Sequence, residues 1–89
     1  MTITYGRVRQ IEVYEGLLAK FSQNAELGAQ LEATGNAVLA ECAVKDRIWG
    51  IGLSMHDPAR FNPSQWRGQN LLGYALMLTR RKLNRIHER

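Results

Sequence analysis

The chain has 89 residues, of which 45% are apolar and 22% are charged. This length and composition fit one globular domain and exclude a second. The single cysteine, Cys42, excludes an internal disulfide and lacks the partners of a zinc site. No apolar run reaches the roughly 18 residues of a membrane span, and the N-terminus lacks the pattern of a secretory signal. We therefore expect a cytoplasmic protein without membrane contact, metal or cofactor.

The net charge of +4 is concentrated at the C-terminus. The last ten residues hold five cations and one glutamate, whereas residues 1–79 hold seven basic and seven acidic side chains. Cations stabilise the negative end of a helix dipole by about 0.3–1 kcal/mol each. The charge therefore predicts a solvated helix end. We rank nucleic-acid binding below other functions, since no aromatic residues are interleaved with these cations.

Two long helices are predicted, one towards each end of the chain. Residues 6–23 and 70–87 each repeat apolar positions at spacings of three and four, as amphipathic helices do. These positions are Val8, Ile11, Tyr14, Leu18 and Phe21 in the first segment, and Leu72, Ala75, Leu76, Thr79, Leu83 and Ile86 in the second. Gly16 costs the first helix about 1 kcal/mol relative to alanine, which predicts a closely packed neighbour there.

A short helix, a short strand and a long loop are predicted between these two helices. Asn24 is a suitable N-cap for the short helix, and Gly35 is a suitable residue to end it. Residues 37–41 form a short apolar run with the length of a strand. Residues 54–68 contain both prolines and predict a loop without regular structure. The predicted fold class is therefore α+β and mostly helical.

Glycine and tryptophan concentrate in residues 46–53 and 66–73. Both tryptophans and half of the eight glycines lie between Trp49 and Gly73. Glycine lets other groups approach closely, and tryptophan offers a flat apolar face with one N–H donor. We interpret the two stretches as one wall of a small-molecule pocket. Asn70 is a predicted N-cap, so the N-terminus of the last helix is a predicted site for a phosphate or another anion.

Five blocks, in order along nearly the whole chain, resemble the NADAR family, which includes N-glycosidases that act on intermediates of riboflavin biosynthesis. The blocks are LAKFSQN at 18–24, LEATG at 31–35, LAE at 39–41, DRIWGIG at 46–52, and WRGQNLLG at 66–73 followed by Leu76-Met77. The resemblance covers the C-terminal half of the family domain. It implies that residues 1–89 are a single partial domain, without the N-terminal half and the glutamate there that is thought to take part in catalysis.

Two carboxylates are candidates for the chemistry that the resemblance implies. Hydrolysis of an N-glycosidic bond needs a carboxylate that activates or positions water and an environment that stabilises an oxocarbenium-like sugar. Asp46 is the first candidate, and a turn-forming aspartate is its equal alternative. Glu41 is the second, and its alternative is an ordinary carboxylate at a strand end, paired with Arg47.

Six residues are candidates for substrate binding. Trp49, flanked by Gly50 and Gly52, is interpreted as stacking on a base or a ribose, with core packing as its alternative. Gly50 and Gly52 are candidates together with Trp49, as neighbours in the same pocket wall. The weaker candidates are Trp66, Asn70 and Lys20. Their alternatives are loop packing, a helix cap and a solvated helix face.

The resemblance implies an N-glycosidase whose substrate is a phosphoribosyl- or ADP-ribosyl-linked base, namely an intermediate of the riboflavin pathway or an ADP-ribose conjugate. The alternative is a truncated, non-catalytic module that binds a nucleotide, ADP-ribose or a partner protein. Apolar helix stripes at both ends of a half-domain also predict self-association or a complementing chain.

Overall fold

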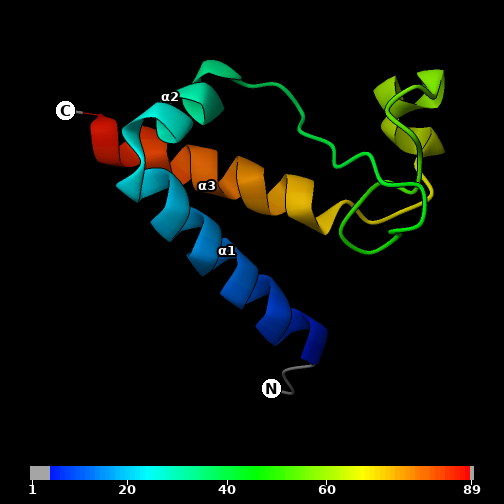
Figure 1. Ribbon diagram of the computed structural model, residues 1–89, viewed down its shortest axis with the longest axis horizontal. Coiled ribbons are helices and arrows are strands. Elements are labelled where there is room, and N and C mark those ends of the chain that lie inside the picture. Colours follow the sequence, from blue (N-terminus) through cyan, green and yellow to red (C-terminus); the bar gives the residue numbers. More distant parts are fainter. Residues whose placement is uncertain (1–4, 89) are drawn as a thin grey trace. The chain divides into compact units, whose positions relative to one another are not determined.

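The structure of the chain, a computed structural model, describes residues 5–88, with side chains from residue 9 onward. These residues form α1 (Tyr5–Gln23), α2 (Ala25–Ala33), the short 3-10 helices η1 (Pro58–Phe61) and η2 (Pro63–Gln65), and α3 (Leu71–His87) (Figure 1). They divide into two compact units. The loop unit is Val38–Tyr74, and the helical unit comprises the described residues before and after it. None of the described helices is long and apolar enough to cross a membrane.

The two long helices and the short one confirm the sequence prediction. The Oδ1 atom of Asn24 accepts a hydrogen bond from the Leu27 N–H at 3.1 Å and so caps α2. Gly35 follows this helix with a φ of 63°, the left-handed conformation that ends many helices. The N-terminal cap and the C-terminal glycine therefore lie where the sequence places them.

Helix α1 has little tertiary support. It contacts α2 near their junction and otherwise runs away from the other helices of the unit (Figure 1). None of its side chains from residue 9 to 23 is fully buried, and the predicted stripe position Val8 lies outside the described side chains. The close neighbour predicted for Gly16 is absent, because no atom comes within 4 Å of the place where its Cβ would lie. That prediction was wrong because Gly16 faces open space among the described residues.

The core of the helical unit lies between α2 and α3. Leu83 is 1% exposed and approaches Gly28, whose missing side chain also leaves room for the Phe21 carbonyl. Arg80 is 7% exposed, and its Nη1 donates to the Thr34 Oγ1 at 2.8 Å. Thr34 is the C-cap of α2, so the guanidinium lies at the negative end of that helix dipole. This placement stabilises a buried charge that has no ion pair among residues 5–88.

The strand predicted at residues 37–41 is wrong, since residues 5–88 contain no strand and the fold is all-helical with loops. A strand needs a neighbouring strand that satisfies its backbone groups in a ladder. Here the Leu39 carbonyl and the Glu41 N–H bond the side chain of Asn70 instead, each at 2.9 Å. The segment is therefore held by this amide side chain and by one main-chain bond from Ile51 to Glu41, and no ladder imposes a register or alternation on it.

The loop predicted at 54–68 contains two single turns of 3-10 helix. Asp57 precedes Pro58 and accepts the Ala59 N–H at 2.9 Å, and Asn62 precedes Pro63 and accepts the Ser64 N–H at 3.2 Å. Proline at the first helical position loses no needed donor, and the preceding Asx side chain caps the turn. The residues that suggested an irregular loop are thus the ones that start these two turns.

Candidate functional site

The glycine- and tryptophan-rich stretch folds against the start of α3 within the loop unit. The main-chain N–H groups of residues 70–72 donate to the carbonyls of residues 48–50, at 2.9 to 3.1 Å. These are the amides that the sequence analysis offered to a phosphate or another anion. In this structure they bond the protein's own carbonyls, so the start of α3 organises the loop and these three groups are not open to a ligand.

Asn70 is the centre of this arrangement. Its side chain is fully buried, and it has a φ of 55°, in the left-handed region. Its carbonyl accepts the Tyr74 N–H at 3.1 Å, which places it at the N-terminal boundary of α3. Its side chain does not cap that helix, because both amide atoms bond the 39–41 segment. Contact between Asn70 and a ligand stays a prediction, and its described bonds are structural.

The glycines of the loop unit allow close approach of the protein's own backbone. A Cβ at Gly50 would lie 2.9 Å from the carbonyl oxygens of both Asp46 and Glu41. Gly52 has a φ of 72°, which side chains rarely adopt. A Cβ at Gly68 or Gly73 would collide with main-chain oxygens of the same unit. Gly50 thus brings together the two residues that carry the candidate catalytic carboxylates.

Asp46 forms a turn with its own backbone and stays ionised. Its Oδ1 accepts the N–H groups of Trp49 at 2.8 Å and Ile48 at 3.0 Å. The hydrogen bond from Trp49 is the largest cause that lowers the pKa of Asp46 below its ordinary value of 3.8; the amides of Ile48 and Gly50 act in the same direction, against partial desolvation. The turn-forming alternative is therefore present in the structure. The bonds from Ile48 and Trp49 both end on Oδ1, so forming this turn is compatible with positioning water or stabilising a cationic sugar.

Glu41 is half-buried at the edge of the same loop. Its main chain is fixed on both sides, because its N–H donates to Asn70 and its carbonyl accepts the Ile51 N–H at 2.9 Å. The ion pair with Arg47 that was its structural alternative does not form within the described part of the chain. The carboxylate is thus attached to a fixed backbone and has no cationic partner there.

The two tryptophans differ in how their indole N–H groups are used. The Nε1 of Trp66 donates to the Arg60 carbonyl at 3.0 Å, which ties it into the loop. The indole of Trp49 has no hydrogen-bond partner among residues 5–88, although its main chain is held by Asp46 and by Leu72. Trp49 therefore combines a fixed backbone, a half-buried ring and an unused donor, whereas the described contact of Trp66 is structural.

Lys20 stands apart from the other candidates. Asp46, Glu41 and the remaining predicted binding residues belong to the loop unit, whereas Lys20 lies on α1 in the helical unit. It is exposed, and its ammonium lies 5.8 Å from the centroid of the Phe21 ring. Its predicted contact with a phosphate has no support from neighbouring residues.

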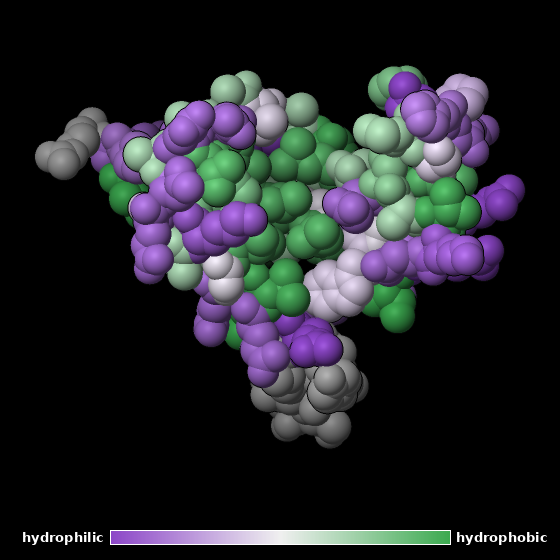
Figure 2. Space-filling view, in the orientation of Figure 1, coloured by the Kyte–Doolittle hydropathy of each residue, from purple (hydrophilic) through white to green (hydrophobic). Residues whose placement is uncertain are grey.

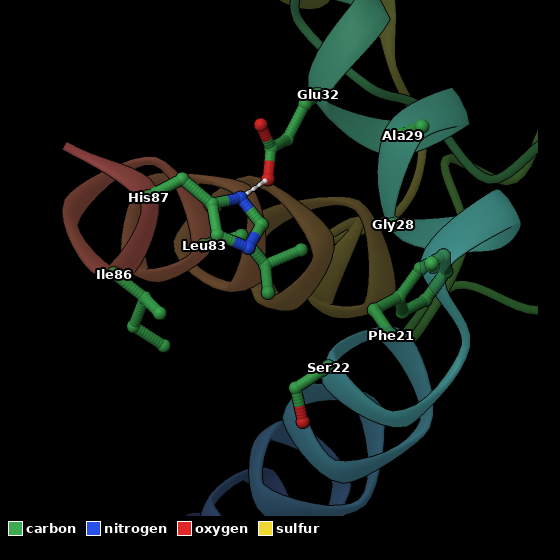
Figure 3. Close-up of a pocket in the computed structure, with 9 residues that line it drawn as sticks. Phe21, Ser22, Gly28, Ala29, Glu32, Leu83, Ile86 and His87 are labelled. Carbon is green, nitrogen blue, oxygen red and sulfur yellow. Dashed lines mark hydrogen bonds and ion pairs between the residues drawn. The ribbon is translucent and has the colours of Figure 1, made fainter.

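Sequence reasoning missed a groove of about 280 Å³ in the helical unit (Figure 3). It lies where the end of α1, one face of α2 and the end of α3 meet, and His87 pairs with Glu32 beside it. None of the predicted site residues lines it. Its residues are spread over three helices, so no local motif marks it in the sequence. Within residues 5–88, no cluster of three histidine, cysteine or acidic side chains is placed to hold a metal ion.

The chain belongs to the NADAR family. The NADAR domain model matches residues 3–84, which confirms the family resemblance. The chain is 44% identical over 68 residues to an N-glycosidase of Acanthamoeba polyphaga mimivirus, covering 76% of this chain and 40% of that protein. It is 38% identical over 76 residues to N-glycosidase YbiA of Escherichia coli (strain K12), with coverage of 85% and 41%.

A third relative carries a pathway in its name. The chain is 41% identical over 64 residues to a riboflavin biosynthesis protein of Vibrio vulnificus, covering 72% of this chain and 14% of that protein. No solved structure matches the chain. The chain spans about two fifths of the length of the two N-glycosidases that it matches.

Proposed function

We propose that this chain supplies the base- and sugar-binding part of an N-glycosidase, which hydrolyses the N-glycosidic bond of a phosphoribosyl- or ADP-ribosyl-linked base. Family membership and the names of two relatives support the reaction class. The name of the Vibrio relative favours an intermediate of riboflavin biosynthesis as substrate over an ADP-ribose conjugate. The observation that carries the proposal is the pairing, in one turn, of the ionised Asp46 with Trp49 and its unused indole donor.

The roles follow from the chemistry of each group. With its lowered pKa, Asp46 is a carboxylate at neutral pH, so it suits water positioning or stabilisation of a cationic sugar and does not suit proton donation. The Trp49 ring offers a face for the base and an N–H donor for a ring oxygen or nitrogen. Glu41 is the second carboxylate of the same unit, attached to a backbone fixed by Asn70.

The test is release of free base from a phosphoribosylamino-pyrimidine and from an ADP-ribosylated base. The enzyme is a chimera that joins this chain to the part of the mimivirus N-glycosidase outside the matched region, and the chain alone is assayed beside it. Because an amide Oδ1 accepts the same two N–H groups, Asp46→Asn keeps the turn and removes only the charge. We expect at least a hundredfold loss of kcat with little change in KM, while Trp49→Phe mainly raises KM.

The outcomes separate the proposal from its alternative. Ligand binding without base release in every form of the chain would identify a non-catalytic binding module. Full turnover by Asp46→Asn would remove the carboxylate from the reaction. Turnover of the ADP-ribosylated base alone would exclude the riboflavin intermediate as substrate.

A further inference from the structure

The groove of the helical unit has an apolar floor and a polar edge. Phe21 from α1 and Ile86 from α3 supply apolar surface above the buried Leu83, while the hydrogen bond between Glu32 and His87 lies along one side (Figure 3). Ile86 is 52% exposed, so the floor is open to solvent. An open apolar surface of this kind is typical of a site that is covered by another protein segment.

The groove continues into the apolar stripe of α1. The stripe residues Ile11, Tyr14, Leu18 and Phe21 are spaced three, four and three apart, which places them on one face of the helix. Ile11 is 49% exposed, and no side chain of residues 9–23 is fully buried. Figure 2 shows apolar side chains (green) exposed over this part of the molecule. Groove and stripe together form one apolar surface, which we name the α1–groove face.

The helical unit has too few buried residues to account for this face. Within the described residues, its fully buried apolar residues are Leu31, Ala75 and Leu83. A helix with an apolar stripe is stable when the stripe packs against another element of the same domain. The two N-glycosidase relatives carry about three fifths of their length outside the region that this chain matches. That additional length is the material in this family that is available to cover the face.

We propose that the α1–groove face binds the part of the NADAR domain that the longer relatives carry outside the matched region, through large apolar side chains placed over Phe21 and Ile86.

The test places an arginine in the groove. Ala29 and Gln30 are neighbouring exposed residues of α2, and only Ala29 lines the groove. Ala29→Arg and Gln30→Arg add the same charge to the same helix, and arginine is a good helix former, so both variants of the isolated chain keep its melting temperature. The chain is co-expressed with the unmatched part of the mimivirus N-glycosidase, and sedimentation velocity measures the stoichiometry. The chimera of the two parts provides the same comparison in one polypeptide.

We expect a one-to-one complex of the two parts. A buried charge without a partner is costly, so Ala29→Arg should weaken the affinity of the two parts by at least about a hundredfold. With Gln30→Arg, the affinity should stay within about twofold of the unsubstituted complex. In the chimera, Ala29→Arg lowers the melting temperature and Gln30→Arg leaves it unchanged. This readout does not depend on catalysis, so it stands if the proposed activity fails.

Three results would overturn the proposal. The first is a chimera in which Ala29→Arg and Gln30→Arg have the same melting temperature. The second is a complex that tolerates arginine in the groove. The third is a homodimer of the chain alone that Ala29→Arg dissociates, which would assign the face to a second copy.

Discussion

The two units of the molecule reach order in different ways. The helical unit relies on local hydrogen bonds within helices and has a small apolar core around Leu83. The loop unit has almost no regular structure and is held by glycines at close approach and by the side chain of Asn70. The candidate carboxylates and both tryptophans lie in the loop unit. The positions of these candidate groups thus depend on a few specific contacts in the loop unit. The helices depend on their own main-chain bonds and form even where their apolar side chains are exposed.

The largest expected effect is the loss of Asn70. Asn70→Ala leaves the half-buried Leu39 carbonyl and Glu41 N–H without partners, and each such group costs at most about 1–3 kcal/mol, or at most about 2–6 kcal/mol together. Because both tryptophans belong to the loop unit, their fluorescence reports its unfolding, and far-UV circular dichroism reports the helices. We expect the fluorescence transition to move to lower urea before the helical signal does. Asn70→Asp keeps the Oδ1 acceptor, and an equal loss in both variants would contradict the two-bond account.

The next effect concerns the core of the helical unit. Leu83 is 1% exposed, and Leu83→Ala should cost about 2–5 kcal/mol through lost packing and a cavity. Leu78 on the same helix is 55% exposed, so Leu78→Ala is the matched control with little effect. Thermal melts followed by far-UV circular dichroism measure both. Similar melting temperatures for the two variants would show that Leu83 is not in a packed core.

Two glycines should respond in opposite directions to the same substitution. Gly50→Ala forces a Cβ against two backbone carbonyls and should destabilise the loop unit by about 1–3 kcal/mol. Gly16→Ala adds a methyl in open space in the middle of α1 and should stabilise by up to about 1 kcal/mol. Urea midpoints of the two variants measure the difference. A shift in the same direction for both variants would contradict either the close carbonyls at Gly50 or the open space at Gly16.

The smallest effect is the pH dependence that comes from Asp46. Its pKa is lowered in the folded state, so its hydrogen-bonded carboxylate stabilises the fold above its ordinary pKa of 3.8. This contribution is complete at pH 7 and is lost as the pH falls through the lowered value. Asp46→Asn lacks the titration, so the difference in urea midpoint between wild type and Asp46→Asn should shrink from pH 7 to pH 3. A constant difference would show that the Trp49 amide does not favour the ionised form.

The helices were predictable because their causes are local. The three-four spacing of apolar residues, the cap at Asn24 and the glycine at 35 each act within a few residues of the chain. The failed strand at 37–41 and the missing neighbour of Gly16 both depended on what lies far away in sequence. A run of four apolar residues followed by Glu41 suits a short strand, but whether a second strand or an amide side chain meets it is a long-range property.

The candidate site was predictable in its members and less so in its geometry. Glycine and tryptophan density marked residues 46–53 and 66–73, and these stretches do lie together through the bonds between residues 48–50 and 70–72. The sequence could not show that these bonds use the helix amides, that Asn70 turns away from its helix, or that Trp66 is occupied and Trp49 is not. Each of these depends on a direction that a side chain or a carbonyl takes in space.

The bridge made by Asn70 has a consequence for local motion in the loop unit. Its two side-chain bonds join residues 31 and 29 positions apart, so this single residue closes most of the loop unit into a ring. Opening one bond leaves the ring closed by the other, and neither end fluctuates independently. The amide proton of Glu41, although in a segment without regular structure, should therefore exchange with solvent as slowly as a proton that is released only when the whole unit opens.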